Sequence, residues 1–161
     1  MEEITPKGIS CSFTGHRELP LFTLSLKRKL NKTLRGLYER GFRVFICGGA
    51  LGFDTLAARS VLALRKDKKD VKLHLYIPCA DQAKSWQQAD MEEYERIKNL
   101  ADEVFILSER YTRGCMHNRN RAMVDASGVC IAYLNKPSGG TAYTVDYAAK
   151  KGLEIINLAS E

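Results

Sequence analysis

The stretch from residue 44 to residue 55, VFICGGALGFDT, most constrains what this chain can fold into. Val44 to Cys47 is an apolar run typical of a strand, and the glycines after it allow the chain to turn sharply. A helical apolar pattern begins at Phe53 and runs to Leu64. A strand, a glycine turn and a helix N-terminus together favour an anion site, because unpaired N–H groups point outward and no Cβ keeps a phosphate away. The alternative is a tight turn in which glycine serves only the backbone.

A second glycine loop near the C-terminus favours the anion-site interpretation. Ser138-Gly139-Gly140-Thr141 follows the apolar run 129–134 and opens a helical pattern that Gly152 ends. Neither loop has the spacing G-x-x-x-x-G-K-[ST], and the sequence contains no G-x-G-x-x-G. Hydrolysis of nucleoside triphosphates and ordinary dinucleotide redox chemistry are therefore disfavoured.

Strand patterns and helical stripes alternate along the chain. Strands are predicted at residues 10–14, 44–47, 71–77, 103–107, 129–134 and 154–158, and helical stripes at 26–38, 53–64, 83–101, 117–126 and 143–149. Strands that alternate with helices at short spacing imply parallel βαβ units with right-handed crossovers. We therefore expect one α/β domain over residues 1–161, a Rossmann-like three-layer sandwich around a mainly parallel sheet.

Composition narrows the class of protein. No apolar run approaches the roughly 18 residues that span a bilayer, and the N-terminus has no basic region followed by an apolar one, so we expect a cytoplasmic protein without membrane contact. The five cysteines are widely spaced, which indicates neither a disulfide framework nor a metal site, and no cofactor is predicted. The net charge of +6 raises the question of an acidic partner. The cations of residues 27–35 fit a solvated helix face, whereas four arginines between residues 110 and 121 gather in a loop and a helix start.

The predicted topology gathers four segments that are distant in sequence. In a parallel α/β sheet the loops that follow the strands share one edge, and ligands bind there at the point where the strand order reverses. The segments are 15–17, 48–54, the stretch around Arg119, and 138–141. Together they offer backbone donors, hydroxyl groups and guanidinium groups, which suit a nucleotide or another phosphorylated small molecule.

Short motifs in these segments resemble those of a known superfamily. The turn Gly48-Gly49-Ala50-Leu51-Gly52-Phe53-Asp54 resembles the G-x-A-x-G-I-D turn of the DNA-processing protein DprA. The stretch Met116-His117-x-Arg119-x-x-x-Met123 resembles the M-H-x-R-K-x-x-M segment of the LOG nucleotide phosphoribohydrolases. Both groups belong to the SLOG superfamily, whose fold is Rossmann-like. The Gly15-His16-Arg17 start and the Gln82-Ala83-Lys84-x-Trp86 segment indicate its YpsA-like branch.

The resemblance implies roles for particular residues. Arg119 falls where the LOG enzymes have a catalytic arginine, which would hold the nucleotide and neutralise its phosphate. Gly139, Gly140 and Thr141 would contact the phosphate or ribose. LOG enzymes also have a glutamate after their second glycine loop, where this chain reads Thr144-Val145-Asp146. This departure speaks against hydrolysis by the LOG route. Related pocket proteins often oligomerise, so the resemblance also implies a possible homo-oligomer.

We therefore expect a sensor or regulatory protein that binds a nucleotide or a nucleotide-derived ligand. One alternative is a nucleoside-monophosphate N-glycoside hydrolase with Arg119 and Asp54 as catalytic residues, and another is single-stranded nucleic-acid binding as in DprA. The predicted ligand-binding residues are Gly15, His16, Arg17, Gly48, Gly49, Gly52, Asp54, Arg119, Ser138, Gly139, Gly140 and Thr141.

Individual candidates also have structural alternatives. Asp54 would hydrogen-bond a ribose hydroxyl or act as a general base, but an aspartate near a helix N-terminus can also simply cap it. His16 is either an acid or base with a pKa near neutrality or a structural histidine. Arg119 and Arg121 cannot share a helix face, and we expect Arg119 to face the pocket. Trp86 either stacks on a base or begins the core stripe of its helix, and the spacing favours the core.

Overall fold

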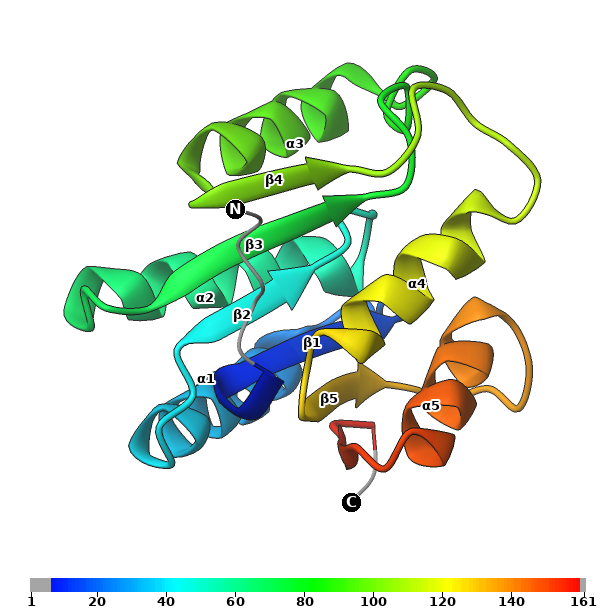
Figure 1. Cartoon of the computed structure of the whole chain (residues 1–161). Helices are drawn as coiled ribbons and strands as arrows, with labels where there is room; N and C mark the ends of the chain where they lie inside the picture. The colour runs from blue at the N-terminus through cyan, green and yellow to red at the C-terminus, as the bar shows by residue number, and fades with distance from the viewer. Residues whose placement is uncertain (1–6, 160–161) are drawn as a thin grey trace, which may run out of the picture.

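Six parallel strands form the central sheet of the computed structural model, which describes residues 7–159 (Figure 1). The strands are β1 (Ser10–Gly15), β2 (Val44–Cys47), β3 (Lys72–Ile77), β4 (Glu103–Ile106), β5 (Val129–Tyr133) and β6 (Glu154–Asn157). Their order across the sheet is β4-β3-β2-β1-β5-β6, and every neighbouring pair is parallel. The predicted parallel α/β sheet is thereby confirmed.

Helices cover both faces of the sheet. They are α1 (Leu24–Glu39), α2 (Phe53–Asp67), α3 (Gln88–Leu100), α4 (Cys115–Asp125) and α5 (Gly140–Lys150), and a short 3-10 turn, η1 (Lys7–Ile9), precedes β1. α2 packs between α1 and α3 on one face, while α4 and α5 pack together on the other (Figure 1). This arrangement is the predicted Rossmann-like three-layer sandwich.

The core lies between the sheet and these helices. Every residue of β2 and of β5 is buried, as expected of strands whose two faces are both covered. On α1, Leu30, Leu34 and Leu37 are buried at helical spacing and present one apolar face to the sheet. The edge strands β4 and β6 are only partly buried.

One predicted helix begins later than its apolar stripe suggests. The stripe runs from residue 83 to 101, but α3 starts at Gln88 and ends at Leu100. The preceding segment is instead a series of turns that is tied to the loop after β4, because Ala80 N–H donates to Ser108 O (2.8 Å) and Tyr111 N–H donates to the Asp81 carboxylate (3.0 Å). These contacts between segments distant in sequence accompany the turns before Gln88, and the helix begins later than the local spacing predicts.

The topology fixes where a ligand site can form. The chain adds β2, β3 and β4 on one side of β1 and then returns to add β5 on its other side. The strand order therefore reverses between β1 and β5, and the carboxyl ends of these strands flank a crevice. Within residues 7–159, no helix has both the length and the apolar character needed to cross a bilayer. All five cysteines are buried as free thiols.

Candidate functional site

A cavity of about 290 Å³ lies at the crevice between β1 and β5. All four segments that the sequence gathers contribute to its wall. The wall residues are Phe13, Thr14, Gly15, His16, Arg17, Ala50, Asp54, Met116, Arg119, Asn120, Gly140 and Thr141. The cavity therefore joins the ends of β1 and β2 to the starts of α2, α4 and α5.

The wall differs in detail from the predicted set of ligand-binding residues. Five predicted residues lie in the same loops but outside the wall, namely Gly48, Gly49, Gly52, Ser138 and Gly139, and their contact with a ligand stays a prediction. Phe13, Thr14, Ala50, Met116 and Asn120 line the wall without having been predicted. Met116 stands three residues before Arg119 on α4 and Asn120 four residues after Met116, so the i, i+3, i+4 pattern starting at Met116 was the signal that could have found them.

The glycine loop after β2 is filled by other parts of the protein. A Cβ atom added to Gly48 would lie 2.6 Å from Nη1 of Arg119 and 2.8 Å from Oδ2 of Asp54. Gly52 has φ +77°, and a Cβ there would collide with the carbonyl of Arg17. Glycine in this loop therefore allows protein groups to approach closely, which is the structural alternative raised for it.

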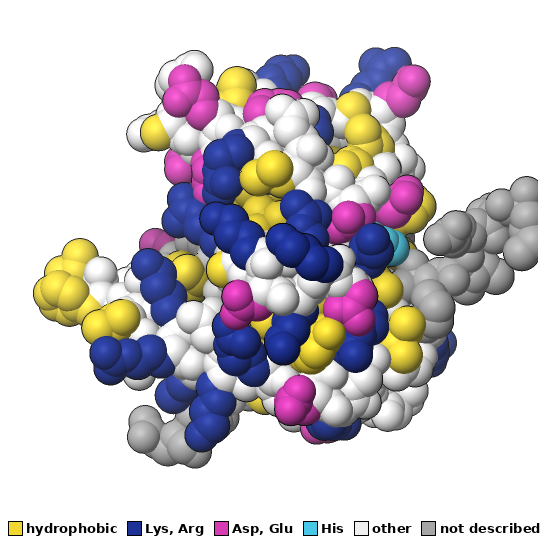
Figure 2. Space-filling view, turned by 90° about the vertical axis from the view of Figure 1, so that its left-hand side faces the viewer, with side chains coloured by type: hydrophobic (Ala, Val, Ile, Leu, Met, Phe, Trp, Pro, Cys, Tyr) yellow, Lys and Arg dark blue, Asp and Glu magenta, His cyan; other side chains and the backbone are white. Residues whose placement is uncertain are grey.

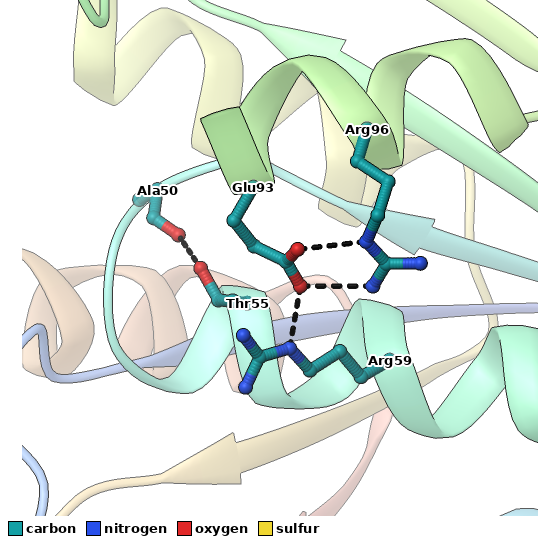
Figure 3. Close-up of polar contacts among 5 residues, drawn as sticks. All are labelled: Ala50, Thr55, Arg59, Glu93 and Arg96. Carbon is teal, nitrogen blue, oxygen red and sulfur yellow. Dashed lines mark hydrogen bonds and ion pairs between the residues drawn. The ribbon is translucent and has the colours of Figure 1, made fainter. Parts of the chain in front are cut away.

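The start of α2 holds the same loop in place. Ala50 N–H donates to Oδ2 of Asp54 (3.2 Å), and the hydroxyl of Thr55 donates to the carbonyl of Ala50 (3.0 Å; Figure 3). Phe53 N–H donates to the carbonyl of His16 (3.1 Å). These bonds tie the loops after β1 and β2 to each other through α2.

The glycine loop before α5 is open. Gly139 has φ +104°, and neither Gly139 nor Gly140 has an atom within 4 Å of the position that a Cβ would take. Both glycines are exposed. Within the described chain, the N–H groups of Gly140, Thr141 and Ala142 donate to no protein acceptor. The positive end of the α5 dipole therefore meets the cavity without a protein anion on it.

Asp54 is a buried carboxylate in the cavity wall, 7% exposed. Burial raises its pKa above the ordinary value, while the Arg119 guanidinium, the N–H of Ala50 and the charge of Arg17 act in the opposite direction. It also lies in the first turn of α2, where a negative charge is favourable. Asp54 therefore lines the cavity and also places a favourable charge at the start of α2, although it accepts its hydrogen bond from the loop residue Ala50 and not from a helix N–H.

Arg119 is 4% exposed and is tied mainly to the protein backbone. Its Nη1 donates to the carbonyls of Gly48 and, at 3.2 Å, of Tyr76, so it joins the carboxyl ends of β2 and β3. Burial lowers its pKa, and the charge of Asp54 opposes that shift. Among the described residues, Nη2 has no hydrogen-bond acceptor, which leaves one edge of the guanidinium for the cavity. Arg121 instead donates to the Tyr143 hydroxyl (2.5 Å) and lies outside the wall.

His16 and Arg17 differ in how far the protein already engages them. Nε2 of His16 accepts the N–H of Asn135 (3.1 Å), and burial together with the charge of Lys136 lowers the pKa of the imidazole. His16 is thus a neutral ring with one nitrogen occupied, which favours the structural interpretation. Arg17 is exposed, and its charge acts on both Asp54 and Arg119. The exposed cation of the cavity is therefore Arg17.

A second cavity, of about 340 Å³, adjoins the first and shares Arg17 and Met116 with it. Trp86 and Tyr111 line it, and Tyr111 is 65% exposed. The preference for Trp86 as a helical core residue is wrong in one respect, because Trp86 lies in the turns before α3. Its ring packs edge-on against Tyr94 with the ring centres 5.2 Å apart, so it both covers the core and forms a cavity wall.

Comparison with known sequences finds one family over most of the chain. The model of the YpsA family, described as the YspA SLOG family, matches residues 13–156. UPF0398 proteins of Bacillus thuringiensis (strain Al Hakam) and Bacillus cereus (strain AH187) are each 30% identical to this chain over 138 residues. These alignments cover 84% of this chain and 74% of each relative.

Two DNA-processing proteins are among the solved structures that this chain resembles. DprA from Streptococcus pneumoniae superposes with a TM-score of 0.65 at 20% identity, over 93% of this chain and 49% of that one. DprA from Helicobacter pylori, described by its single-stranded DNA binding mode, gives a TM-score of 0.65 at 21% identity, over 94% of this chain and 64% of that one. The chain thus spans about half of one DprA and under two thirds of the other. At these identities the likeness shows a shared fold.

Proposed function

The chain belongs to the YspA SLOG family, and from this premise we propose that its cavity binds a nucleotide or nucleotide-derived phosphorylated ligand as a sensor or regulator. The observation that carries the proposal is one cavity lined by both the open N-terminus of α5 and the exposed Arg17. Unpaired N–H groups at a helix N-terminus and a guanidinium are both well suited to hold a phosphate.

The phosphate is assigned to the start of α5. Gly140 and Thr141 lie at the first turn of this helix, and the space above Gly139 and Gly140 is unfilled by protein. Thr141 adds a hydroxyl to the wall. Arg17 supplies the neutralising charge, since Arg119 is already bound to the carbonyls of Gly48 and Tyr76. This assignment shifts the predicted phosphate cation from Arg119 to Arg17.

The rest of the ligand follows from the other walls. A carboxylate repels a phosphate but accepts hydrogen bonds from hydroxyl groups, so Asp54 suits a ribose. The second cavity offers the rings of Trp86 and Tyr111 beside Arg17. Aromatic walls next to a phosphate site suit a nucleobase, because every base presents a π face for stacking.

Hydrolysis of an N-glycosidic bond is the second candidate function that we propose for the same cavity. Such a reaction needs a carboxylate near the anomeric carbon to stabilise an oxocarbenium-like state. Asp54 is the one carboxylate among the wall residues, whereas Asp146 is exposed and pairs with Lys150 at 3.0 Å. Any hydrolytic activity is therefore assigned to Asp54, and Asp54→Asn should abolish base release if this route operates.

The proposal is tested by thermal unfolding of the purified protein with AMP, ADP-ribose, NAD and cyclic dinucleotides. A ligand at about 100 times its Kd adds ~2.7 kcal/mol of stability. For a chain of this size that corresponds to about 5 to 10 °C. We expect a shift with at least one member of the panel, and that ligand is then assayed for base release.

Two matched variants locate the binding. Gly140→Glu meets no atom within 4 Å and places a carboxylate on the N–H groups of α5, so the ligand-induced shift should disappear while the fold remains. Gly36→Glu on the exposed face of α1 also meets no atom within 4 Å and should leave the shift unchanged. No shift from any nucleotide in the wild type would refute the proposal. Binding of oligo(dT) that weakens steeply with salt would then favour single-stranded nucleic acid, the function described for the Helicobacter pylori neighbour.

A further inference from the structure

A third cavity lies between α2 and α3, away from the two cavities described above. Its volume is about 500 Å³, and it shares no wall residue with the first cavity. Figure 2 views the molecule from the side on which the strands begin and shows Lys and Arg side chains gathered around a small hydrophobic area. The wall of this third cavity consists of Arg59, Leu62, Ala63, Arg65, Lys66, Lys69, Arg96 and Leu100. We call these residues the α2–α3 groove.

The groove carries a concentrated positive charge. Glu93 accepts from Nε of Arg59 at 2.5 Å and from Nε of Arg96 at 2.7 Å, so one carboxylate serves two arginines (Figure 3). The bonds from Arg96 and Arg59 lower the pKa of Glu93 to about 2, against the opposing effect of burial. Glu93 therefore stays ionised over the physiological range and fixes both guanidinium groups at the groove.

The remaining cations are less compensated. Arg65 pairs with Asp102 at 2.7 Å, whereas Lys66 and Lys69 form no ion pair with any described residue. Five cations and the two carboxylates that pair with them leave an excess of three positive charges, half of the chain's net +6. A surface that gathers half of the net charge attracts an acidic partner and repels basic ones.

The floor of the groove is aliphatic. Leu62 and Ala63 come from α2, and Leu100, which is 41% exposed, comes from the end of α3. None of the residues that form this groove is aromatic. Single-stranded nucleic acids are held by cationic grooves that also contain aromatic stacking platforms, so this wall suits them poorly. Aliphatic side chains flanked by cations instead match a protein segment that carries both leucines and carboxylates.

We propose that the α2–α3 groove binds an acidic amphipathic helix of a partner protein. The apolar side chains of that helix pack on Leu62, Ala63 and Leu100, and its carboxylates meet the cations of α2 on one side and Arg96 on the other. Two parallel ridges with a groove between them provide the geometry in which an amphipathic helix packs its apolar face. This interaction is independent of the nucleotide proposal, because the two sites have no residue in common.

The test measures fluorescence anisotropy of a labelled helical peptide of about 15 residues, long enough to form a helix on the surface. Its leucines are spaced i, i+3, i+4 and i+7, and glutamates flank them. We expect saturable binding by the full chain and at least tenfold weaker binding by the double variant Lys66→Glu, Lys69→Glu. Leu100→Ser should also weaken binding, because it removes part of the apolar floor.

A matched control separates this groove from general charge effects. The double variant Lys27→Glu, Lys32→Glu changes the net charge equally, on exposed lysines of α1, and should bind the peptide as the wild type does. Four outcomes would overturn the proposal: no binding by the wild type, equal binding of a peptide with the same composition in scrambled order, an unaffected Leu100→Ser variant, or equal loss in the α1 control. Binding of oligo(dT) that depends on Lys66 and Lys69, without peptide binding, would reassign the groove to nucleic acid.

Discussion

The two glycine loops at the carboxyl edge of the sheet have similar sequences but different surroundings. Protein groups fill the space beside Gly48 and Gly52, where Arg119, Asp54 and the carbonyl of Arg17 approach the backbone. The space beside Gly139 and Gly140 is empty of protein. A strand, glycines and a helix start therefore specify a turn. Whether that turn is available to a ligand depends on whether residues from elsewhere in the chain occupy the space beside its glycines.

This difference explains why a local motif cannot rank the two loops. The groups that fill the first loop include Arg119, which lies 71 residues after Gly48 and reaches it from α4. The sequence of residues 44–55 therefore cannot predict that Arg119 lies against Gly48. The open loop is exposed because its neighbours along the sheet leave it uncovered, which is equally a property of the whole fold.

The largest effect is expected from Gly52→Ala, which would break the filled loop. Its backbone conformation, φ +77° and ψ −122°, is one that L residues rarely adopt, and the new Cβ would collide with the carbonyl of Arg17. Strain and overpacking together should lower the free energy of unfolding by about 4 kcal/mol. Urea unfolding followed by circular dichroism measures this loss. A variant as stable as the wild type would show that the loop is not held as described.

A smaller effect is expected from Gly139→Ala, which makes the matching change in the open loop. Gly139 has φ +104°, so alanine is strained there as well, but no atom lies within 4 Å of its Cβ. The expected loss is about 2 kcal/mol, from backbone strain alone. The difference between the two alanine variants in the same urea titration gives the loss of unfolding free energy that is due to the collision with Arg17 in the filled loop. Equal losses at the two positions would remove the distinction between the loops. Gly140→Ala, inside the first turn of α5, serves as the unstrained control and should not destabilise the protein.

The smallest effect is expected in the pH dependence of stability, from the Asp54 carboxylate beside the filled loop. Burial raises the pKa of Asp54 in the folded protein, so folding disfavours its ionised form. The stability of the wild type relative to Asp54→Asn should therefore decrease as pH rises from the unfolded value, near 3.8, through the folded pKa, and stay level above it. Unfolding of both proteins between pH 3 and pH 7 measures the difference. A relative stability that instead increases with pH would mean that Arg119 and the Ala50 N–H outweigh burial.

Hydrophobic periodicity and glycine positions were sufficient to predict the fold class and most of its elements. The strand at residues 44–47 and the stripe of α1 were predicted as they occur, because alternation, apolar runs and glycine punctuation reflect burial directly. The edge of the sheet that carries the cavity also followed, since parallel topology places all four loops there. The start of α3 did not follow, because Ala80 and Asp81 are bound by the loop after β4.

Side-chain roles in the site were harder to predict than its location. The preference for Arg119 as the phosphate cation came from its motif, and nothing in that motif reveals that Nη1 is bound to the carbonyls of Gly48 and Tyr76. Arg17 belongs to the same predicted set, yet its exposure and its place between two cavities depend on the packing of three separate loops. Hydrogen bonds made to backbone carbonyls far along the chain leave no periodic signal in the sequence.

The bond from Phe53 N–H to the carbonyl of His16 has a consequence for how a ligand would be held. Together with the approach of Gly52 to Arg17, it joins the loops after β1 and β2 into one preorganised half of the cavity. A ligand that settles against this half freezes little backbone there, so the conformational entropy lost on association falls mainly on the opposite half, around residues 135–139. Affinity would then be tuned by substitutions that stiffen or loosen that single segment.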